Sequence, residues 1–248
     1  MSISFRTTLR RYGAQPVLAF ALLSAAVSCA QPTAVDVNPA NETTCRAGAV
    51  HVLGDSNVAL YGLPGKWLTD STVPVGFNFG YPVAGYTLAG SFGVAPSMDQ
   101  QFTQLLDHVA QCPGGEYSHR VLVSAGGNDV SAGVFGYVTG AAAVADMAAL
   151  FNRIRTAGFT LFVNPPFTPK LGSAEGGRSV ATAVVAYYQT LPASERVGCE
   201  EYWYGPGLNS APFGDPTLFT TEDDKHISTA SAALLGACVG PSITSRIV

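Results

Sequence analysis

Charged residues are scarce in this 248-residue chain, because Asp, Glu, Lys and Arg together make up only 12% of it, about half the usual share. Hydrophobic residues account for 47%, which is ordinary for a globular protein and excludes an intrinsically disordered chain. We therefore expect one folded domain, with a surface covered mainly by small and uncharged polar residues.

Hydrophobic runs long enough to span a bilayer are also lacking. The apolar run near the start, residues 17–27, follows a segment with three arginines and precedes the small residues Ser28 to Ala30. This order is typical of an export signal. We expect residues 1–30 to be a signal peptide and the protein to be secreted or extracytoplasmic. An alternative is a lipoprotein anchored through Cys29, although Ala26 stands where such signals usually carry Leu.

Two further regions follow from this interpretation. Residues 31–44 are polar and without periodicity, so we expect a linker there, with the folded domain over residues 45–248. Removal of three arginines with the signal changes the formal net charge from −4 to −7. An acidic exported chain is a poor binder of nucleic acid and of anionic membranes. We expect a monomer without a transmembrane segment in its mature form.

Closely spaced cysteines are absent, and no Cys/His spacing suits a metal ion; we expect no metal. Without Cys29, four cysteines remain, an even number that predicts two disulfides in an exported chain, with three possible connectivities. We prefer the pairs Cys45–Cys112 and Cys199–Cys238. Cys45 and Cys112 each precede a predicted strand, which places both at the same edge of a parallel sheet.

Short apolar runs alternate with amphipathic stretches along the rest of the chain. The predicted strands cover residues 49–53, 121–124, 159–163 and 196–203. The predicted helices cover residues 97–111, 141–157, 174–190 and 228–239. Residues 58–96 are rich in Gly and aromatic residues, and we expect one strand and irregular loops there. Alternating strands and helices predict a layered α/β fold with a parallel sheet.

Three short blocks carry the chemistry: Gly54-Asp55-Ser56, Gly126-Gly127-Asn128-Asp129 and Asp223-Asp224-Lys225-His226. The first two follow predicted strands at their carboxyl ends, where open α/β sheets place their sites. Together they supply a nucleophile, an amide that stabilises an oxyanion, and a base with its carboxylate. Each block alone has a structural interpretation, as a helix N-cap, a turn or a solvated charged loop.

In this order, the blocks resemble those of the SGNH/GDSL hydrolase family. Asn164-Pro165-Pro166, which follows a predicted strand, also resembles the proline pair often found at this place in the family. The resemblance spans residues 49–240 and implies a flavodoxin-like, three-layer α/β/α sandwich that acts without metal or cofactor. It assigns Ser56, Asp223 and His226 as catalytic residues. The oxyanion hole would comprise the Ser56 and Gly90 backbone N–H groups and the Asn128 side chain, with Gly85 as the rival for Gly90.

The chain departs from the family pattern in two places. Gly62 and Pro64 interrupt the helix expected after Ser56, and Ile227 replaces the Pro that often follows the catalytic His. A different nucleophile, Ser91 in an Ala-Gly-Ser-Phe-Gly elbow, would lack a clear preceding strand and leave Asn128 unexplained.

The resemblance implies a serine esterase or lipase that cleaves acyl esters of small molecules, lipids or glycans through an acyl-enzyme. The alternatives are an acyltransferase, an O-deacetylase acting on cell-wall or other glycans, and a non-catalytic surface binding module. We expect the loops at 57–96, 130–140 and 205–222 to determine acyl specificity.

Overall fold

A computed structural model describes residues 45, 47–55, 75–78, 97–124, 126–166, 175–199 and 229–246 of the chain. All of them belong to one compact unit formed by residues 38–248. The expected signal peptide and linker lie outside the described residues.

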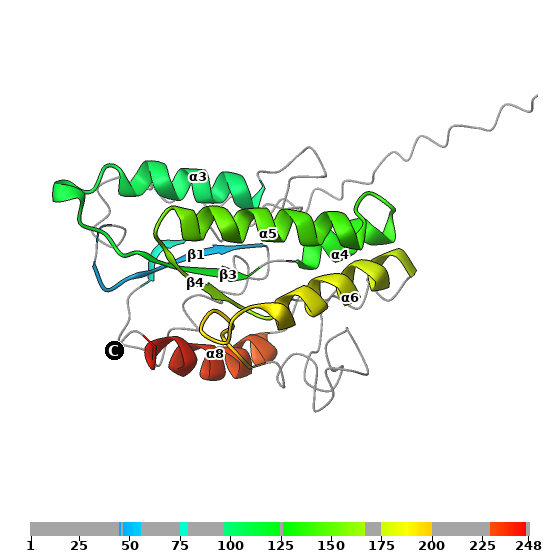
Figure 1. Cartoon of the computed structure of the whole chain (residues 1–248). Helices are drawn as coiled ribbons and strands as arrows, with labels where there is room; N and C mark the ends of the chain where they lie inside the picture. The colour runs from blue at the N-terminus through cyan, green and yellow to red at the C-terminus, as the bar shows by residue number, and fades with distance from the viewer. Residues whose placement is uncertain are drawn as a thin grey trace, which may run out of the picture. The chain divides into compact units, whose positions relative to one another are not determined.

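A parallel sheet forms the centre of this unit (Figure 1). Its strands are β1 (Val50–Gly54), β2 (Val75–Asn78), β3 (Arg120–Ser124) and β4 (Thr160–Val163), in the order β2-β1-β3-β4. Arg196 forms a further parallel bridge with Val163, next to β4. This order is that of flavodoxin-like folds, so the expected fold class is confirmed.

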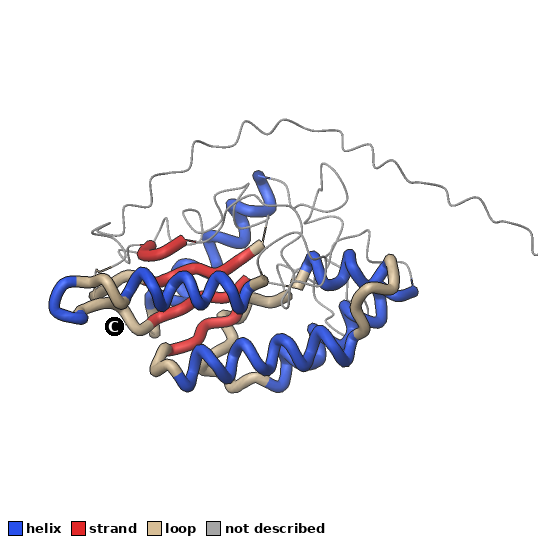
Figure 2. The backbone as a smooth tube through the Cα atoms, turned by 90° about the horizontal axis from the view of Figure 1, so that it is seen from above, coloured by secondary structure: helices blue, strands red, loops and turns tan. Residues whose placement is uncertain are grey.

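Helices cover both faces of the sheet. They are α3 (Met98–Val109), α4 (Gly127–Val134), α5 (Gly140–Thr156), α6 (Glu175–Thr190) and α8 (Thr229–Thr244), with a 3₁₀ turn at Pro113–Gly115. Seen from above, α3 crosses in front of the strands and α8 passes behind them (Figure 2). The three layers of the predicted sandwich are therefore present. Within the described segments, no helix is both long and apolar enough to cross a bilayer.

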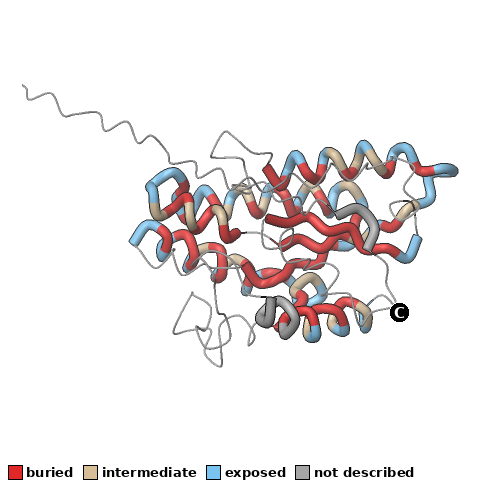
Figure 3. Tube along the Cα trace, turned by 180° about the vertical axis from the view of Figure 1, so that it is seen from behind, coloured by how far each residue is buried: buried red, intermediate tan, exposed pale blue. Residues whose placement is uncertain are grey.

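Local sequence explains where the helices begin. Ser97 accepts a hydrogen bond from the Gln100 N–H while the Gln100 side chain accepts one from the Ser97 N–H, which forms a capping box at the start of α3. Thr139 caps α5 through the Ala142 N–H. Strands β1, β3 and β4 are buried almost throughout, whereas α3, α5 and α6 are buried on one side only (Figure 3), because strands covered on both faces need apolar residues at every position.

The two disulfides connect the pairs preferred from the sequence. Cys45–Cys112 joins the segment before β1 to the segment after α3, and Cys199–Cys238 joins α8 to the segment after α6. Each bridges elements that are far apart in the sequence.

Three details differ from the sequence prediction. Helix α4 covers residues 127–134, where the sequence had predicted no helix. Helix α8 passes Val239, where we expected it to end, and continues through Pro241 to Thr244. In the strand predicted at 196–203, only Arg196 among the described residues 196–199 pairs with the sheet.

Candidate active site

The carboxyl ends of three strands meet at one edge of the sheet. Gly54 at the end of β1 pairs with Ser124 at the end of β3. The Asn164 N–H, just past β4, donates to the Val123 carbonyl at 2.9 Å. Asp55, Ser124 and Asn164 follow or end these strands and are all buried. Polar side chains buried at this edge are the arrangement expected of an α/β active site.

Asn128 is brought to this edge by the sharp start of α4. Gly126 precedes the helix with φ of 113° and ψ of −22°, a left-handed conformation that favours glycine. The Gly126 carbonyl accepts the first helical hydrogen bond, from Val130, at 3.0 Å. Asn128 then lies in the first turn and is partly exposed, whereas the neighbouring Asp129 is 1% exposed. Asn128 is therefore less buried at this edge than Asp129.

The segment after β4 packs against the start of α4. A Cβ atom added to Gly126 would lie 3.2 Å from the Cβ of Pro166, which is tighter than an ordinary contact. Asn164 is 1% exposed, and its amide nitrogen lies 3.4 Å from the Ser124 hydroxyl oxygen, while its Oδ1 has no hydrogen-bond partner. The Asn-Pro-Pro segment therefore supports the turn that carries Asn128.

The far end of α4 is held by a close backbone contact with α6. A Cβ atom on Gly176 would lie 2.1 Å from the Gly133 carbonyl oxygen, and one on Gly133 would lie 2.5 Å from a methyl group of Val180. Neither position therefore has room for a side chain larger than the hydrogen atom of glycine. This contact fixes α4, and with it Asn128, against the rest of the helical layer.

Gln101 of α3 contacts the end of β1. Its Oε1 accepts from the Gly54 N–H at 3.1 Å, and its Nε2 donates to the Gly54 carbonyl at 3.0 Å. Gln101 is fully buried. Sequence reasoning missed this residue, although a polar side chain on the buried face of an amphipathic helix, between Met98 and Leu105, was a visible signal.

Of the residues expected at the site, the structure describes Asn128 and the flanks of two blocks. Gly54-Asp55 and Gly126 to Asp129 lie at the same edge of the sheet, as the parallel arrangement predicted. Ser56, Gly85, Gly90, Asp223 and His226 lie outside the described residues. Within the described part of the chain, no group of three or more His, Cys, Asp or Glu is arranged to hold a metal ion.

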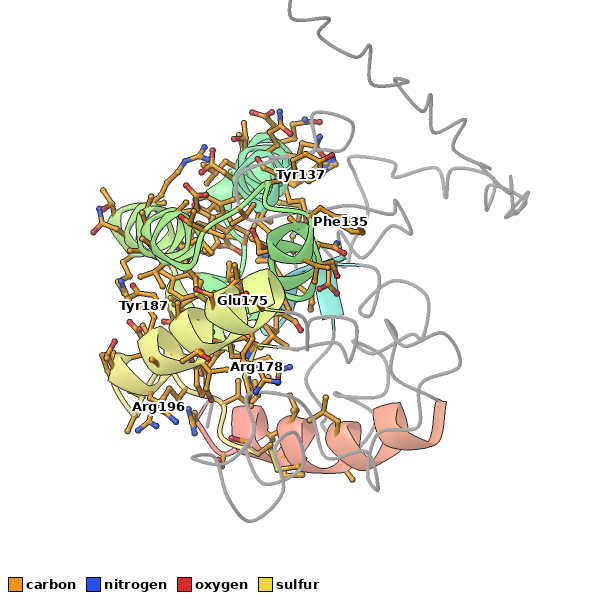
Figure 4. The ribbon with its side chains drawn as sticks, turned by 90° about the vertical axis from the view of Figure 1, so that its right-hand side faces the viewer. Phe135, Tyr137, Glu175, Arg178, Tyr187 and Arg196 are labelled. Carbon is orange, nitrogen blue, oxygen red and sulfur yellow. A yellow bond between two sulfur atoms is a disulfide. The ribbon has the colours of Figure 1, made fainter. Side chains whose placement is uncertain are left out.

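Figure 4 views the molecule from the carboxyl side of the sheet, with Phe135 and Tyr137 near its margin. These aromatic residues follow α4 and are 63% and 66% exposed, with ring centroids 6.3 Å apart. Glu175 and Arg178, at the start of α6, are exposed on the same side.

Among the solved structures that this chain resembles, we report two that it matches over nearly their full length. The crystal structure of TesA matches with a TM-score of 0.51 at 18% identity, over 81% of this chain and 99% of that one. A psychrotrophic esterase, EstA from Pseudoalteromonas sp., inhibited by monoethylphosphonate, matches with a TM-score of 0.51 at 15% identity, over 80% and 97%. The chain has the SGNH/GDSL hydrolase fold.

Comparison of structures finds this likeness where comparison of whole sequences does not. No protein-family model matches the sequence, and no curated protein matches it significantly.

Proposed function

We propose that this protein is an exported serine hydrolase of the SGNH type that cleaves acyl esters. The observation that carries the proposal is the meeting of Gly54-Asp55 and Asn128 at one carboxyl edge, in a fold shared with the esterase EstA. Ser56 follows Asp55 directly in the chain. The nucleophile and the oxyanion amide would thus come from adjacent strand ends.

The proposed reaction has two steps. Ser56 Oγ attacks the ester carbonyl carbon while His226 takes its proton, and Asp223 orients the imidazole. The Asn128 amide donates to the developing oxyanion, together with the N–H groups of Ser56 and Gly90. His226 then gives the proton to the leaving alcohol, and water attacks the acyl-enzyme, which releases the acid and free Ser56.

The two disulfides support an extracytoplasmic location. They accord with the proposed signal peptide at residues 1–30, linker at 31–44 and catalytic domain at 45–248. We assign the exposed pair Phe135 and Tyr137 to the part of the substrate surface contributed by the 130–140 loop.

Hydrolysis of p-nitrophenyl esters, from acetyl to palmitoyl, tests the proposal. Wild-type mature protein should turn over at least part of the series, and Ser56→Ala should abolish turnover while leaving the unfolding transition unchanged. An Asn128→Ala variant should lose about 10²–10³-fold in kcat. Full activity of Ser56→Ala would disprove the serine mechanism.

Two controls separate the alternatives. Added alcohols that divert the acyl group from water would identify an acyltransferase on the same site. A folded protein that hydrolyses no ester and is not labelled by a fluorophosphonate would identify a binding module.

A further inference from the structure

The Gln101 side chain forms an unusual contact for a helix residue, because it bonds both backbone groups of one strand residue. The Gly54 N–H donates to Oε1 at 3.1 Å and the Gly54 carbonyl accepts from Nε2 at 3.0 Å. The amide thus pairs with Gly54 as the backbone of a neighbouring strand would.

The sheet explains why such a partner is needed. On the β2 side, Val50 pairs with Val75 and Val52 with Asn78, where β2 ends. Backbone groups of alternate strand residues point to the same side, so Gly54 would face the position beyond the end of β2. Gln101 fills that position and satisfies two buried polar groups that would otherwise be costly to leave unpaired.

Gly54 is also the last residue of β1 and the first residue of the block Gly54-Asp55-Ser56. We propose that Gln101 is a positioning residue for the nucleophile: by pairing with both backbone groups of Gly54, it fixes the direction in which residues 55 and 56 leave β1. This inference rests on the proposed function, since it assumes that Ser56 is the nucleophile.

Gln101 is suited to this role because a carboxamide both accepts and donates. Methionine has a similar length but cannot replace either hydrogen bond. Glutamate reproduces the pair only when protonated, when one oxygen accepts and the hydroxyl donates. An ionised carboxylate would place two acceptors against the Gly54 carbonyl.

The test compares Gln101→Met and Gln101→Glu with wild type, and uses Gln104→Met and Gln104→Glu as matched controls. Gln104 lies on the same helix and is only partly buried, whereas Gln101 is fully buried. We expect Gln101→Met to lower kcat for p-nitrophenyl acetate about 10–100-fold, as a small misplacement of the nucleophile does, with KM within about twofold of wild type. The Gln104 variants should remain within about twofold in both constants.

Gln101→Glu supplies a readout that general destabilisation would not produce. Burial favours the protonated form of a carboxyl group, so this variant should regain activity relative to wild type as the pH falls from 8 to 5. We take the ratio of kcat of Gln101→Glu to kcat of wild type at each pH. Protonation of the catalytic base affects both proteins alike and therefore cancels in this ratio. Recovery should reach within about threefold of wild type at the acidic end.

The outcomes distinguish the inference from the proposed function. If wild type shows no activity that depends on Ser56, the proposed function fails and this inference falls with it. If wild type depends on Ser56 but folded Gln101→Met keeps kcat within twofold, only the inference is overturned. A ratio for Gln101→Glu that does not change with pH overturns it as well, and this variant decides the matter where Gln101→Met does not fold.

Discussion

His51 is a buried histidine near the amino end of β1, the strand whose carboxyl end leads to the candidate site. It lies within β1, is fully buried, and pairs through Nε2 with the Ser118 carbonyl oxygen at 2.9 Å. Its ring also contacts Phe159 edge-on, at 6.3 Å between centroids. Burial lowers the pKa of His51 from 6.5 to about 4, despite the hydrogen bond to Ser118. The folded protein therefore holds His51 neutral under mildly acidic conditions.

This burial predicts a loss of stability in acid. Between pH 6.5 and pH 4 the unfolded chain protonates this side chain and the folded chain does not, so the free energy of unfolding falls as the pH falls. The depressed pKa of about 4 corresponds to about 3 kcal/mol lost across that window. Urea unfolding at several pH values measures the free energy of unfolding of wild type and of His51→Gln. The difference between the two proteins should shrink toward low pH, because only wild type loses the contribution of His51.

A His51→Gln protein with the same dependence on pH as wild type would contradict this account of His51.

At the scale of elements, the pairing of α4 with α6 depends on glycine. The Gly133 carbonyl oxygen would lie 2.1 Å from a Cβ on Gly176, so Gly176→Ala forces the two helices apart. We expect a loss of about 1–3 kcal/mol in unfolding free energy, the usual cost of overpacking. Because α4 carries Asn128, kcat should fall as well, which ester hydrolysis measured well below the unfolding temperature would show.

Gly48 offers a matched control, since nothing lies within 4 Å of a Cβ added there. Gly48→Ala should change stability by no more than about 0.5 kcal/mol and leave kcat unaltered. Equal effects of the two substitutions would show that the close helix contact does not matter.

Helix α4 also shows what the sequence can and cannot predict. Strands β1, β3 and β4 were predicted within one or two residues, because buried parallel strands are short apolar runs. Residues 127–134 contain two glycines and an Asn-Asp pair, which favour turns. Helix α4 packs against α6, which lies far along the chain, and no local sequence pattern predicts such a contact.

The candidate site likewise has features that the sequence predicts and features that it does not. The carboxyl edge that carries Asp55 and Asn128 was predictable, because parallel strands place their ends together. The role of Gln101 was not, since it depends on β2 ending at Asn78, two residues short of the level of Gly54. Strand register is a property of the assembled sheet rather than of either segment.

At the scale of the whole molecule, the two disulfides join different regions. Cys45–Cys112 connects the segments that precede β1 and β3, at the amino ends of these strands. Cys199–Cys238 holds α8, which begins three residues after His226. The Ser242 hydroxyl and the Arg246 guanidinium add hydrogen bonds from the end of α8 and the following turn to the Val197 carbonyl.

These positions predict similar effects on stability and different effects on activity. The bridged residues are 67 and 39 positions apart, and loop-closure entropy gives about 4 kcal/mol for either bridge. The double variants Cys45→Ser/Cys112→Ser and Cys199→Ser/Cys238→Ser should therefore lose comparable unfolding free energy. Only the second pair releases the helix that follows His226, so its kcat should fall at least about tenfold further, as expected when a general base is misplaced. Ester hydrolysis at a temperature where both variants remain folded measures this contrast. A larger loss of kcat in Cys45→Ser/Cys112→Ser would mean that α8 does not position the base.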